Sequence, residues 1–293
     1  MFFQQLINGL TMGSVYILIS IGLTMVYGIL ELLHFAHGDV FMVGAFASLV
    51  AVGLLKTNFI FAIIIAMICS GFVGCFIEFF AYRPVRNAAK ITAIISGIGM
   101  AFVLENVTLI LFGAQTKPFP SIGVPQKAIR ITGNISITNY QILIIVVTLI
   151  MVTALQLFLK YSKAGLAMRA TSQDFIASSL MGINVNKIIS TTFFVGSALA
   201  GAAGAFVGIY FNALYPTMGS MPGMKAFAIV LLGGLGSIPG TIVGGLILGF
   251  VESFAEGYLG NFIVGKDAFA FVILILVLLI KPSGLFGKKI EKV

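Results

Sequence analysis

The stretch MFFQQLINGLTMGSVYILISIGLTMVYGIL, residues 1–30, decides the fold class, because it contains no Asp, Glu, Lys or Arg. Four further stretches are equally free of charged side chains: residues 57–77, 131–159, 188–224 and 226–251. Each can supply the roughly 20 apolar residues that cross a bilayer as a helix. Only 9% of the 293 residues are charged, whereas soluble domains carry about a quarter. We therefore expect an all-α, polytopic transmembrane helical bundle.

The apolar segments predict eight or nine spans within a single transmembrane domain over residues 1–293. They lie near residues 5–29, 40–55, 59–80, 91–112, 140–159, 188–211, 225–256 and 262–280. The count depends on residues 225–256, where GGLGSIPGTIVGG (233–245) interrupts the apolar run. Because Gly and Pro disfavour a straight helix, this region is expected to form two short helices joined by a turn.

The distribution of Lys and Arg predicts the orientation. The segments 81–90, 160–187 and the tail from 281 hold 11 of the 17 basic residues, and short basic loops face the cytoplasm. The C-terminus is then inside, and the N-terminus is outside with nine spans or inside with eight. The net charge of +8 does not indicate nucleic-acid binding, because the basic residues lie between apolar segments rather than on one face.

A polar cluster, ELLHFAHGDV (31–40), lies between two apolar runs. Charged groups within a bilayer are costly, so they pair, face a water-filled cavity or lie at an interface. A break between helices that lines a path is one interpretation, and a polar loop at the membrane surface is the other. A metal site is disfavoured, because His34 and His37 have no further defined ligand set. We expect the translocation path at this break and at a second, glycine-rich break, which could be corresponding halves of an internal repeat: His37, Gly38, Asp39, Gly233, Gly234, Gly236 and Gly240.

Two further features are expected to join helices to one another. Glu78 and Glu105 are isolated acids in apolar runs, and interhelical hydrogen bonding is favoured over a proton relay. Small residues recur at every fourth position in VGSALAGAAGAFVGIY (195–210), which indicates close helix packing along one face; these are Gly196, Ala200, Gly204 and Gly208.

The segment 160–187 is expected to form a short amphipathic helix at the cytoplasmic surface. Thr171 to Asp174 fits a capping box, and Gly182 is placed to end the helix. The apolar face could lie on membrane lipid or enter a groove in another protein. Its apolar side carries Phe175, Ile176, Leu180 and Ile183.

The chain is not expected to be an enzyme. Gly260, Gly265 and Lys266 fit a P-loop, but Asp267 stands where that motif needs Ser or Thr for magnesium. No cofactor is expected, and any ATP hydrolysis should take place in separate subunits.

Four segments, taken together and in order, resemble a known family: INGLTMGSVYILISIGLTMVYGILELLHFAHGDVFMVGAFAS (7–48), GLAMRATSQDFIASSLMGINVNK (165–187), GSALAGAAGAF (196–206) and AFAIVLLGGLGSIPGTIVGG (226–245). The family is the permease subunits of bacterial branched-chain amino-acid ABC importers, and the resemblance is greatest to the H-type permeases of the leucine, isoleucine and valine system. It covers nearly the whole chain.

The resemblance implies a multi-pass subunit of the bacterial inner membrane that works by alternating access. It implies as partners a second homologous permease, two cytoplasmic ATP-binding subunits and a periplasmic amino-acid-binding protein. The helix from Thr171 to Ile183 would be the coupling helix that enters an ATPase cleft. Many ABC importers carry Glu-Ala-Ala, three residues and Gly in this loop; alignment on Gly182 places Ile176, Ala177 and Ser178 here, so the acidic residue is absent.

Three alternatives to a branched-chain amino-acid permease remain open at this point. A related ABC importer for urea, short amides or other amino acids would share these features. A secondary carrier would be driven by protons through Glu31, Asp39 and Glu105. A passive channel would need neither ATP nor a proton gradient.

Overall fold

The computed structural model describes residues 1–293 except 87, 121–126, 133–134, 260–265, 282 and 288–293. The described residues form the following elements in chain order: α1 (Phe2–Leu30), α2 (His37–Gly53), α3 (Phe59–Ile77), the π-helix η1 (Glu78–Tyr82), α4 (Lys90–Phe112), β1 (Ala128–Thr132), β2 (Ile135–Thr138), α5 (Asn139–Tyr161), α6 (Lys163–Thr171), α7 (Phe175–Leu180), α8 (Val185–Phe211), α9 (Ser220–Gly233), α10 (Ile238–Leu259) and α11 (Lys266–Ile280).

Six segments of the described chain are long and apolar enough to cross a membrane: α1, α3 with η1, α4, α5, α8 and α10. Three shorter apolar helices accompany them: His37–Gly53, Ser220–Gly233 and Phe271–Ile280. The expected all-α polytopic bundle is therefore confirmed. The expected count of eight or nine spans is not confirmed, because a helix of 14 residues such as α9 rises only about 21 Å and a bilayer core is about 30 Å thick.

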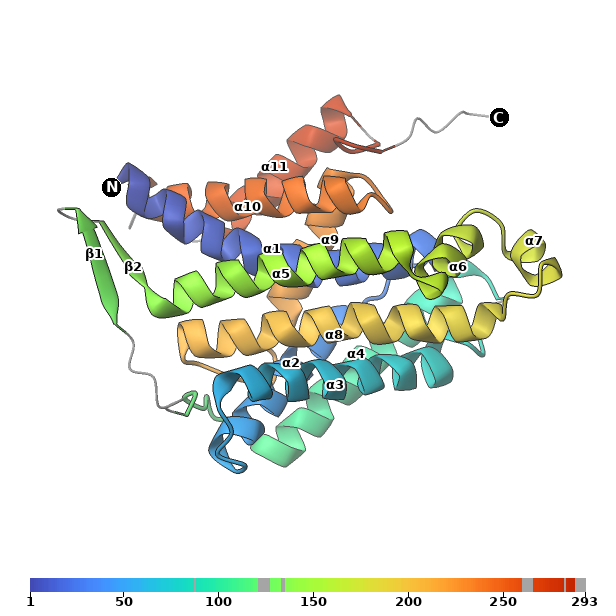
Figure 1. Cartoon of the computed structure of the whole chain (residues 1–293), viewed down its shortest axis with the longest axis horizontal. Coiled ribbons are helices and arrows are strands. Elements are labelled where there is room, and N and C mark those ends of the chain that lie inside the picture. The colour runs from blue at the N-terminus through green and yellow to red at the C-terminus, as the bar shows by residue number, and fades with distance from the viewer. Residues whose placement is uncertain (87, 121–126, 133–134, 260–265, 282, 288–293) are drawn as a thin grey trace.

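Helices α1 and α8 form the centre of the bundle. Most of their apolar windows are buried, whereas α4 and α5 are largely exposed. Figure 1 shows α8 beside α2 and α3, and α1 contacts α8, α9 and α10. The exposed faces of α4 and α5 are apolar, with Ile110 and Leu149 as examples. These outer helices therefore present the surface that is suited to lipid.

Small residues let the central helices approach one another closely. A Cβ atom on Gly22 of α1 would lie 2.3 Å from the carbonyl oxygen of Gly196 on α8. On the same stripe of α8, a Cβ on Gly204 would lie 2.0 Å from the carbonyl oxygen of Phe41 in α2. The stripe thus packs against two different helices. Ala200 is fully buried, and Gly208 lies next to Phe119.

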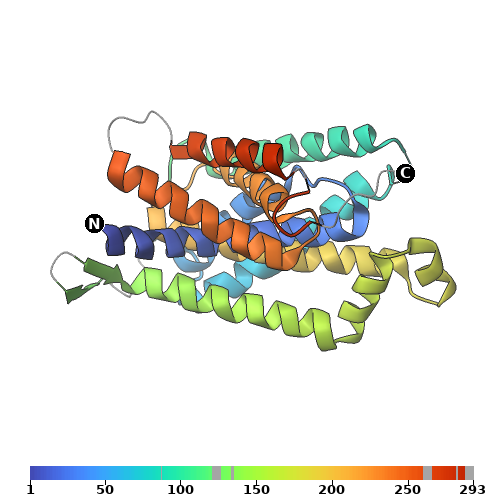
Figure 2. The same ribbon diagram turned by 90° about the horizontal axis from the view of Figure 1, so that it is seen from above.

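The bundle has two distinct ends. The N-terminus and the hairpin of β1 and β2 lie at one end, which we call the hairpin end, and α7 projects from the opposite end, the α7 end (Figures 1 and 2). The strands pair antiparallel with Ile129 opposite Ile137. The backbone N–H of Ser136 donates to the side chain of Gln4 over 2.9 Å, which attaches the hairpin to α1.

Candidate functional site

Two short helices, α2 and α9, begin against one another inside the bundle. A Cβ on Gly38 would lie 2.3 Å from the carbonyl oxygen of Gly219, and one on Gly219 would lie 2.2 Å from the carbonyl oxygen of Gly38. Only glycine permits this approach, because the clashing atoms belong to the backbone of both segments. Gly223 packs on Gly38 one turn further along α9. The N-terminal ends of both helices are therefore held together.

A cavity of about 300 Å³ lies at this junction. Its wall comes from α1, the segment before α2, the first turns of α2 and α9, and α11. Most of the wall is apolar, with a few polar groups, as is usual for small-molecule sites. The lining residues are Leu23, Leu33, His34, Phe35, His37, Gly38, Asp39, Gly219, Ser220, Gly223, Met224, Phe227, Ala228, Phe271 and Leu274.

The polar side chains of this wall are buried but only partly hydrogen-bonded. His37 Nε2 lies 2.9 Å from the carbonyl oxygen of Ile19, and His34 Nδ1 lies 3.3 Å from the hydroxyl of Tyr82. The other ring nitrogens, His34 Nε2 and His37 Nδ1, have no partner, and neither has Asp39 Oδ1. Within the described chain, no group of three or more His, Cys, Asp or Glu side chains is placed to hold a metal ion.

Glu105 of α4 is joined to the start of α9. Its Oε1 accepts a hydrogen bond of 3.1 Å from the Ser220 hydroxyl. This contact is the interhelical hydrogen bond that the sequence favoured for Glu105. Glu31 instead lies at the surface and pairs with Lys90 over 3.6 Å.

The second group of expected path residues lies elsewhere. Gly233, Gly234, Gly236 and Gly240 form the tight connection between α9 and α10, where the backbones of Gly233 and Gly240 are in contact. None of the four lines the cavity at Gly38. The structure therefore does not bring the two expected groups together, and a role for these glycines in the path stays a prediction. Gly38 instead meets Gly219 and Gly223 at the start of α9, ten or more residues earlier in the chain than Gly233.

Sequence reasoning missed the start of α9. We expected a span from residue 225, but α9 begins at Ser220 after a connecting segment, residues 212–219, whose second half is a turn. The residues that mark this helix start in the sequence are Pro216, Gly219 and Pro222, because Pro is tolerated in the first turn of a helix but not in its interior. A long uncharged run, 188–224, hid this break.

A second missed feature is a buried ion cluster around Lys225 of α9. Its Nζ lies 2.8 Å from Glu252 Oε1 of α10 and 2.6 Å from Asp267 Oδ1 of α11. The hydroxyl of Tyr16 donates to Glu252 and accepts from Lys225. Because Lys225 is inside the bundle, it does not count as a loop residue for orientation. Asp267, the residue that breaks the P-loop pattern, forms an ion pair with Lys225. Gly260 and Gly265, the glycines of that pattern, lie outside the described residues.

The segment that follows α5 forms two short helices at the α7 end. Thr171 is the last residue of α6, is buried, and donates its hydroxyl to the carbonyl of Ala167 over 2.8 Å. The expected capping box from Thr171 is therefore wrong. Asp174 caps α7 instead, accepting from the N–H groups of Ile176 and Ala177 at 2.7 and 2.9 Å, because its carboxylate lies directly before the first turn.

Helix α7 presents apolar side chains to solvent. Ile176, Leu180 and Met181 are 74, 82 and 83% exposed, and Phe175 and Ala177 are exposed as well. Gly182, with φ +82°, ends this turn, and Ile183 is half-buried against the core. An exposed apolar group of this kind marks an interaction surface.

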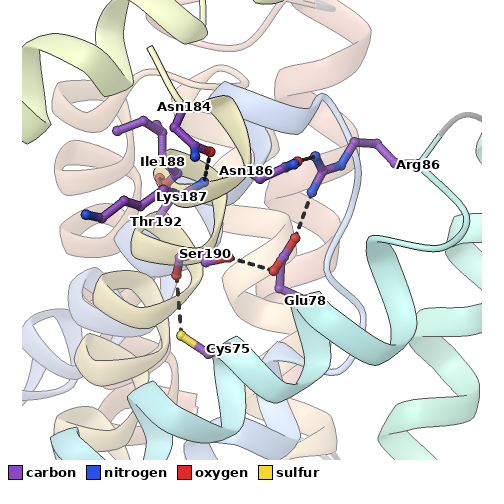
Figure 3. A network of polar contacts seen from close by, with 9 residues as sticks. All are labelled: Cys75, Glu78, Arg86, Asn184, Asn186, Lys187, Ile188, Ser190 and Thr192. Carbon is purple, nitrogen blue, oxygen red and sulfur yellow. Dashed lines mark hydrogen bonds and ion pairs between the residues drawn. The ribbon is translucent and has the colours of Figure 1, made fainter. Parts of the chain in front are cut away.

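A polar network connects the exit of α7 to the bundle, as Figure 3 shows. Glu78, the first residue of η1, is buried and accepts from Arg86 at 2.7 Å and from Ser190 of α8 at 2.8 Å. Arg86 also donates to Asn186 in the first turn of α8, at 2.7 Å. Partial burial lowers the pKa of Arg86, and Glu78 opposes this shift. The network joins η1, Arg86 and the start of α8.

Glu78 and Ser190 thus form the interhelical contact that the sequence favoured for Glu78. The π-helix that begins at Glu78 is a departure from α geometry that occurs frequently at functional sites. It contacts α8, the helix that follows α7 in the chain.

Together, the apolar bundle, the two short helices that meet at an internal cavity, and the projecting apolar helix define a polytopic membrane transport protein. The sequence matches the family described as the permease component of branched-chain amino acid transport systems over residues 5–278. The chain belongs to this family.

Its relatives are similar over their full length. The high-affinity branched-chain amino acid transport system permease protein LivH of Salmonella typhimurium is 42% identical, covering 100% of this chain and 98% of the relative. BraD of Pseudomonas aeruginosa, a permease protein of the same description, is 40% identical with the same coverage. The ribose import permease protein RbsC of Escherichia coli is 35% identical over 101 residues, 32% of each chain. No solved structure matches the chain.

Proposed function

We propose that this chain is the membrane-spanning subunit of an ATP-driven importer that moves branched-chain amino acids across a bacterial inner membrane. The observation that carries this proposal is the similarity, over the entire chain, to relatives named for branched-chain amino acid transport. The described residues contain little mass outside the bundle apart from α6, α7 and the hairpin. Energy input and substrate capture therefore fall to partner proteins.

The partners that we propose are a second homologous permease, two cytoplasmic ATP-binding subunits and a periplasmic amino-acid-binding protein. The α7 end carries Arg83, Arg86, Lys90, Lys160, Lys163, Arg169 and Lys187, so it is the cytoplasmic side by the distribution of basic loops. The apolar side chains of α7 then enter a groove in an ATP-binding subunit. Ile176 stands where many importers have an acidic residue, so apolar contact dominates this interface.

The way in which α7 is attached supports a mechanism of alternating access. α7 leads into α8 through residues 181–184, and α8 is joined through Ser190 and Asn186 to Glu78 and Arg86. A displacement of α7 by the ATP-binding subunit would act on α3 and α8 together. Since α8 packs on α1 and α2 through Gly196 and Gly204, the same displacement would reach the cavity at Gly38. Packed interfaces of this kind switch between discrete arrangements.

Replacement of Leu180 by Asp tests the docking of α7. Leu180 is 82% exposed, so the substitution should leave the bundle folded. Copurification of the ATP-binding subunits in mild detergent should fall by at least about tenfold, since loss of a central contact costs about 2 kcal/mol or more. Leu55→Asp is the matched control, because Leu55 is also exposed but lies in the turn after α2. Undiminished copurification with Leu180→Asp would contradict the role of α7.

A second candidate substrate class is favoured by one observation, the local similarity to a ribose import permease. Permeases of related importers for urea, short amides or other amino acids belong to the same alternative. Uptake of labelled leucine, ribose and urea by the reconstituted importer separates these substrates. A proton-driven carrier through Glu31, Asp39 and Glu105 receives less support, because Glu31 pairs with Lys90 at the surface and Glu105 binds Ser220.

A further inference from the structure

The end of α9 is closed by a segment near the C-terminus of the chain. The last carbonyl groups of a helix have no partner within that helix. In α9, the carbonyl of Leu232 accepts from the backbone N–H of Leu285 over 2.8 Å. The carbonyl of Gly233 likewise accepts from the N–H of Phe286 over 2.9 Å. Both donors belong to SGLFG, residues 283–287, which we call the C-terminal strap.

Glycines allow the strap to lie directly on the connection between α9 and α10. Gly284 has φ +76°, and a Cβ on it would lie 2.5 Å from the carbonyl oxygen of Leu231. Gly234 has φ +103°, and a Cβ there would overlap the backbone nitrogen of Gly287. Both positions have a backbone conformation that other residues rarely adopt, and neither leaves room for a side chain. The strap and the connection are therefore in direct backbone contact.

The strap follows α11 almost directly. The backbone N–H of Lys281 donates to the carbonyl of Val277 over 2.7 Å, which continues the hydrogen bonding of α11. The N–H of Gly284 donates to the carbonyl of Lys281 over 2.9 Å, and the Lys281 ammonium donates to the carbonyl of Leu285 over 2.7 Å. These contacts hold the strap in a tight turn, so its position is set by that of α11.

The starts of α9 and α11 are joined as well. Lys225, in the second turn of α9, forms ion pairs with Asp267, the second residue of α11, and with Glu252 of α10. Breaking a buried ion pair is costly, because it leaves a charge uncompensated. The three helices also contact one another. Helices α9 and α11 are thus connected at both ends, by the ion pair at their starts and by the strap at their ends.

The end of α9 lies beside the segment that carries α7. A hollow of about 130 Å³ is lined by Gly236 of the α9–α10 connection and Ile238 of α10, and by Met168 and Arg169 of α6. Because α6 leads into α7 at the α7 end of the bundle, the strap lies on the side that faces the proposed ATP-binding subunits.

We propose that the C-terminal strap locks α9, α10 and α11 into one unit that moves as a whole when the permease changes access, an inference that rests on the function proposed above. Both α9 and α11 line the cavity at Gly38, through Phe227 and Leu274 among others. Because these helices are tied together, the cavity changes shape by movement of the unit against α2 and α8, without separation of α11 from α9. Where α2 meets the unit, Gly38 and Gly219 have no side chains to obstruct sliding.

Distances between spin labels test whether the unit moves as a whole. Ile280→Cys at the end of α11 and Leu235→Cys in the α9–α10 connection place two labels within the unit, at exposed side chains. Lys187→Cys in α8 with Leu235→Cys is the matched pair across its boundary. Both pairs are measured in the assembled importer, with all other cysteines replaced, in the presence and absence of ATP. The distance within the unit should stay constant to within about 1–2 Å, and the distance to α8 should change by more.

The outcomes separate this inference from the proposed function. A change within the unit as large as the change to α8, or no change in either distance, would overturn the inference. Absence of ATP-dependent leucine uptake by the unmodified importer would overturn the proposed function, and uptake is measured independently of the label distances.

Replacement of Gly284 by Ala tests whether the strap matters for transport. Its methyl group would meet the carbonyl oxygen of Leu231 and displace the strap. Gly113→Ala is the matched control, because Gly113 has nearly the same backbone angle, φ +78°, but a Cβ there meets no atom within 4 Å. In liposomes containing the importer and supplied with the binding protein, Gly284→Ala should lower the leucine transported per ATP hydrolysed by about fivefold or more, the lower end of typical coupling between sites. The control should leave this ratio unchanged, and equal ratios for the two variants would overturn the inference.

The label pair within the unit separates loss of coupling from loss of folding. In the Gly284→Ala importer, the distribution of distances between labels at positions 280 and 235 should broaden, while the ATP-binding subunits still copurify. Deletion of residues 282–293 should have the same effects, and deletion of residues 288–293, which keeps the strap, should have none. Should the strap variants fail to assemble, the two label distances in the otherwise unmodified importer decide.

Discussion

Replacement of Gly38 by Ala tests the contact between α2 and α9 from which the cavity is built. The new Cβ would lie 2.3 Å from the carbonyl oxygen of Gly219, whereas ordinary contacts begin at 3.4 Å. The difference of 1.1 Å must be met by movement of two backbones, since no flexible side chain can give way. Such overpacking costs about 1–3 kcal/mol, and the better helix propensity of Ala returns up to about 1 kcal/mol.

We therefore expect Gly38→Ala to lower the free energy of unfolding by about 1–2 kcal/mol. The assay is titration of the detergent-solubilised chain with dodecyl sulfate, followed by far-ultraviolet circular dichroism. Gly99→Ala in α4 is the matched control, because a Cβ there meets no atom within 4 Å. It should leave stability unchanged or raise it by up to about 1 kcal/mol.

The pairing of the two glycines gives a second, independent check. Gly219→Ala makes the reciprocal clash with Gly38, at 2.2 Å. Once the first methyl group has separated the helices, the second has less to displace, so the double variant should cost less than the sum of the single variants. Additive costs, or a Gly38→Ala variant as stable as the Gly99→Ala control, would show that the helix ends are not in contact.

Three further predictions concern the other polar and glycine contacts. Glu78→Gln should weaken the connection between η1 and α8 by about 1–3 kcal/mol and reduce leucine uptake per ATP hydrolysed; unchanged coupling in proteoliposomes would contradict it. Lys225→Met leaves Glu252 and Asp267 without their cation and should destabilise the bundle by about 3–5 kcal/mol, with partial recovery when Glu252→Gln is added, measured by the same dodecyl sulfate titration. Gly196→Leu should prevent α8 from packing on Gly22 and abolish a folded, monodisperse peak in size-exclusion chromatography; a normal elution profile would contradict this packing.

The fold class could be predicted because hydrophobicity is a property of each segment by itself. Residues 1–30 carry no charge, and they form one buried helix, α1. The break near His37 was also visible, since polar residues and Gly38 interrupt two apolar runs. Similarly, a helix in the segment 160–187 was expected, although Asp174 rather than Thr171 caps it.

The partners of these segments could not be predicted, because contacts between helices depend on how the bundle is assembled. The sequence shows glycines at 38 and 219, but it does not show that these two pack on one another. Likewise, the sequence places Lys225 at the start of an expected span, and only the assembled bundle brings Glu252 and Asp267 to it. One apolar run can contain a helix end that no charge marks, as α9 shows.

The most direct test of the central claim is leucine accumulation in proteoliposomes that contain this chain with its proposed permease partner and ATP-binding subunits, supplied with the binding protein. The account predicts accumulation against a gradient only when ATP and the binding protein are both present, and none when the chain is reconstituted alone. Concentrative uptake by the isolated chain, driven by a pH gradient without ATP, would contradict it.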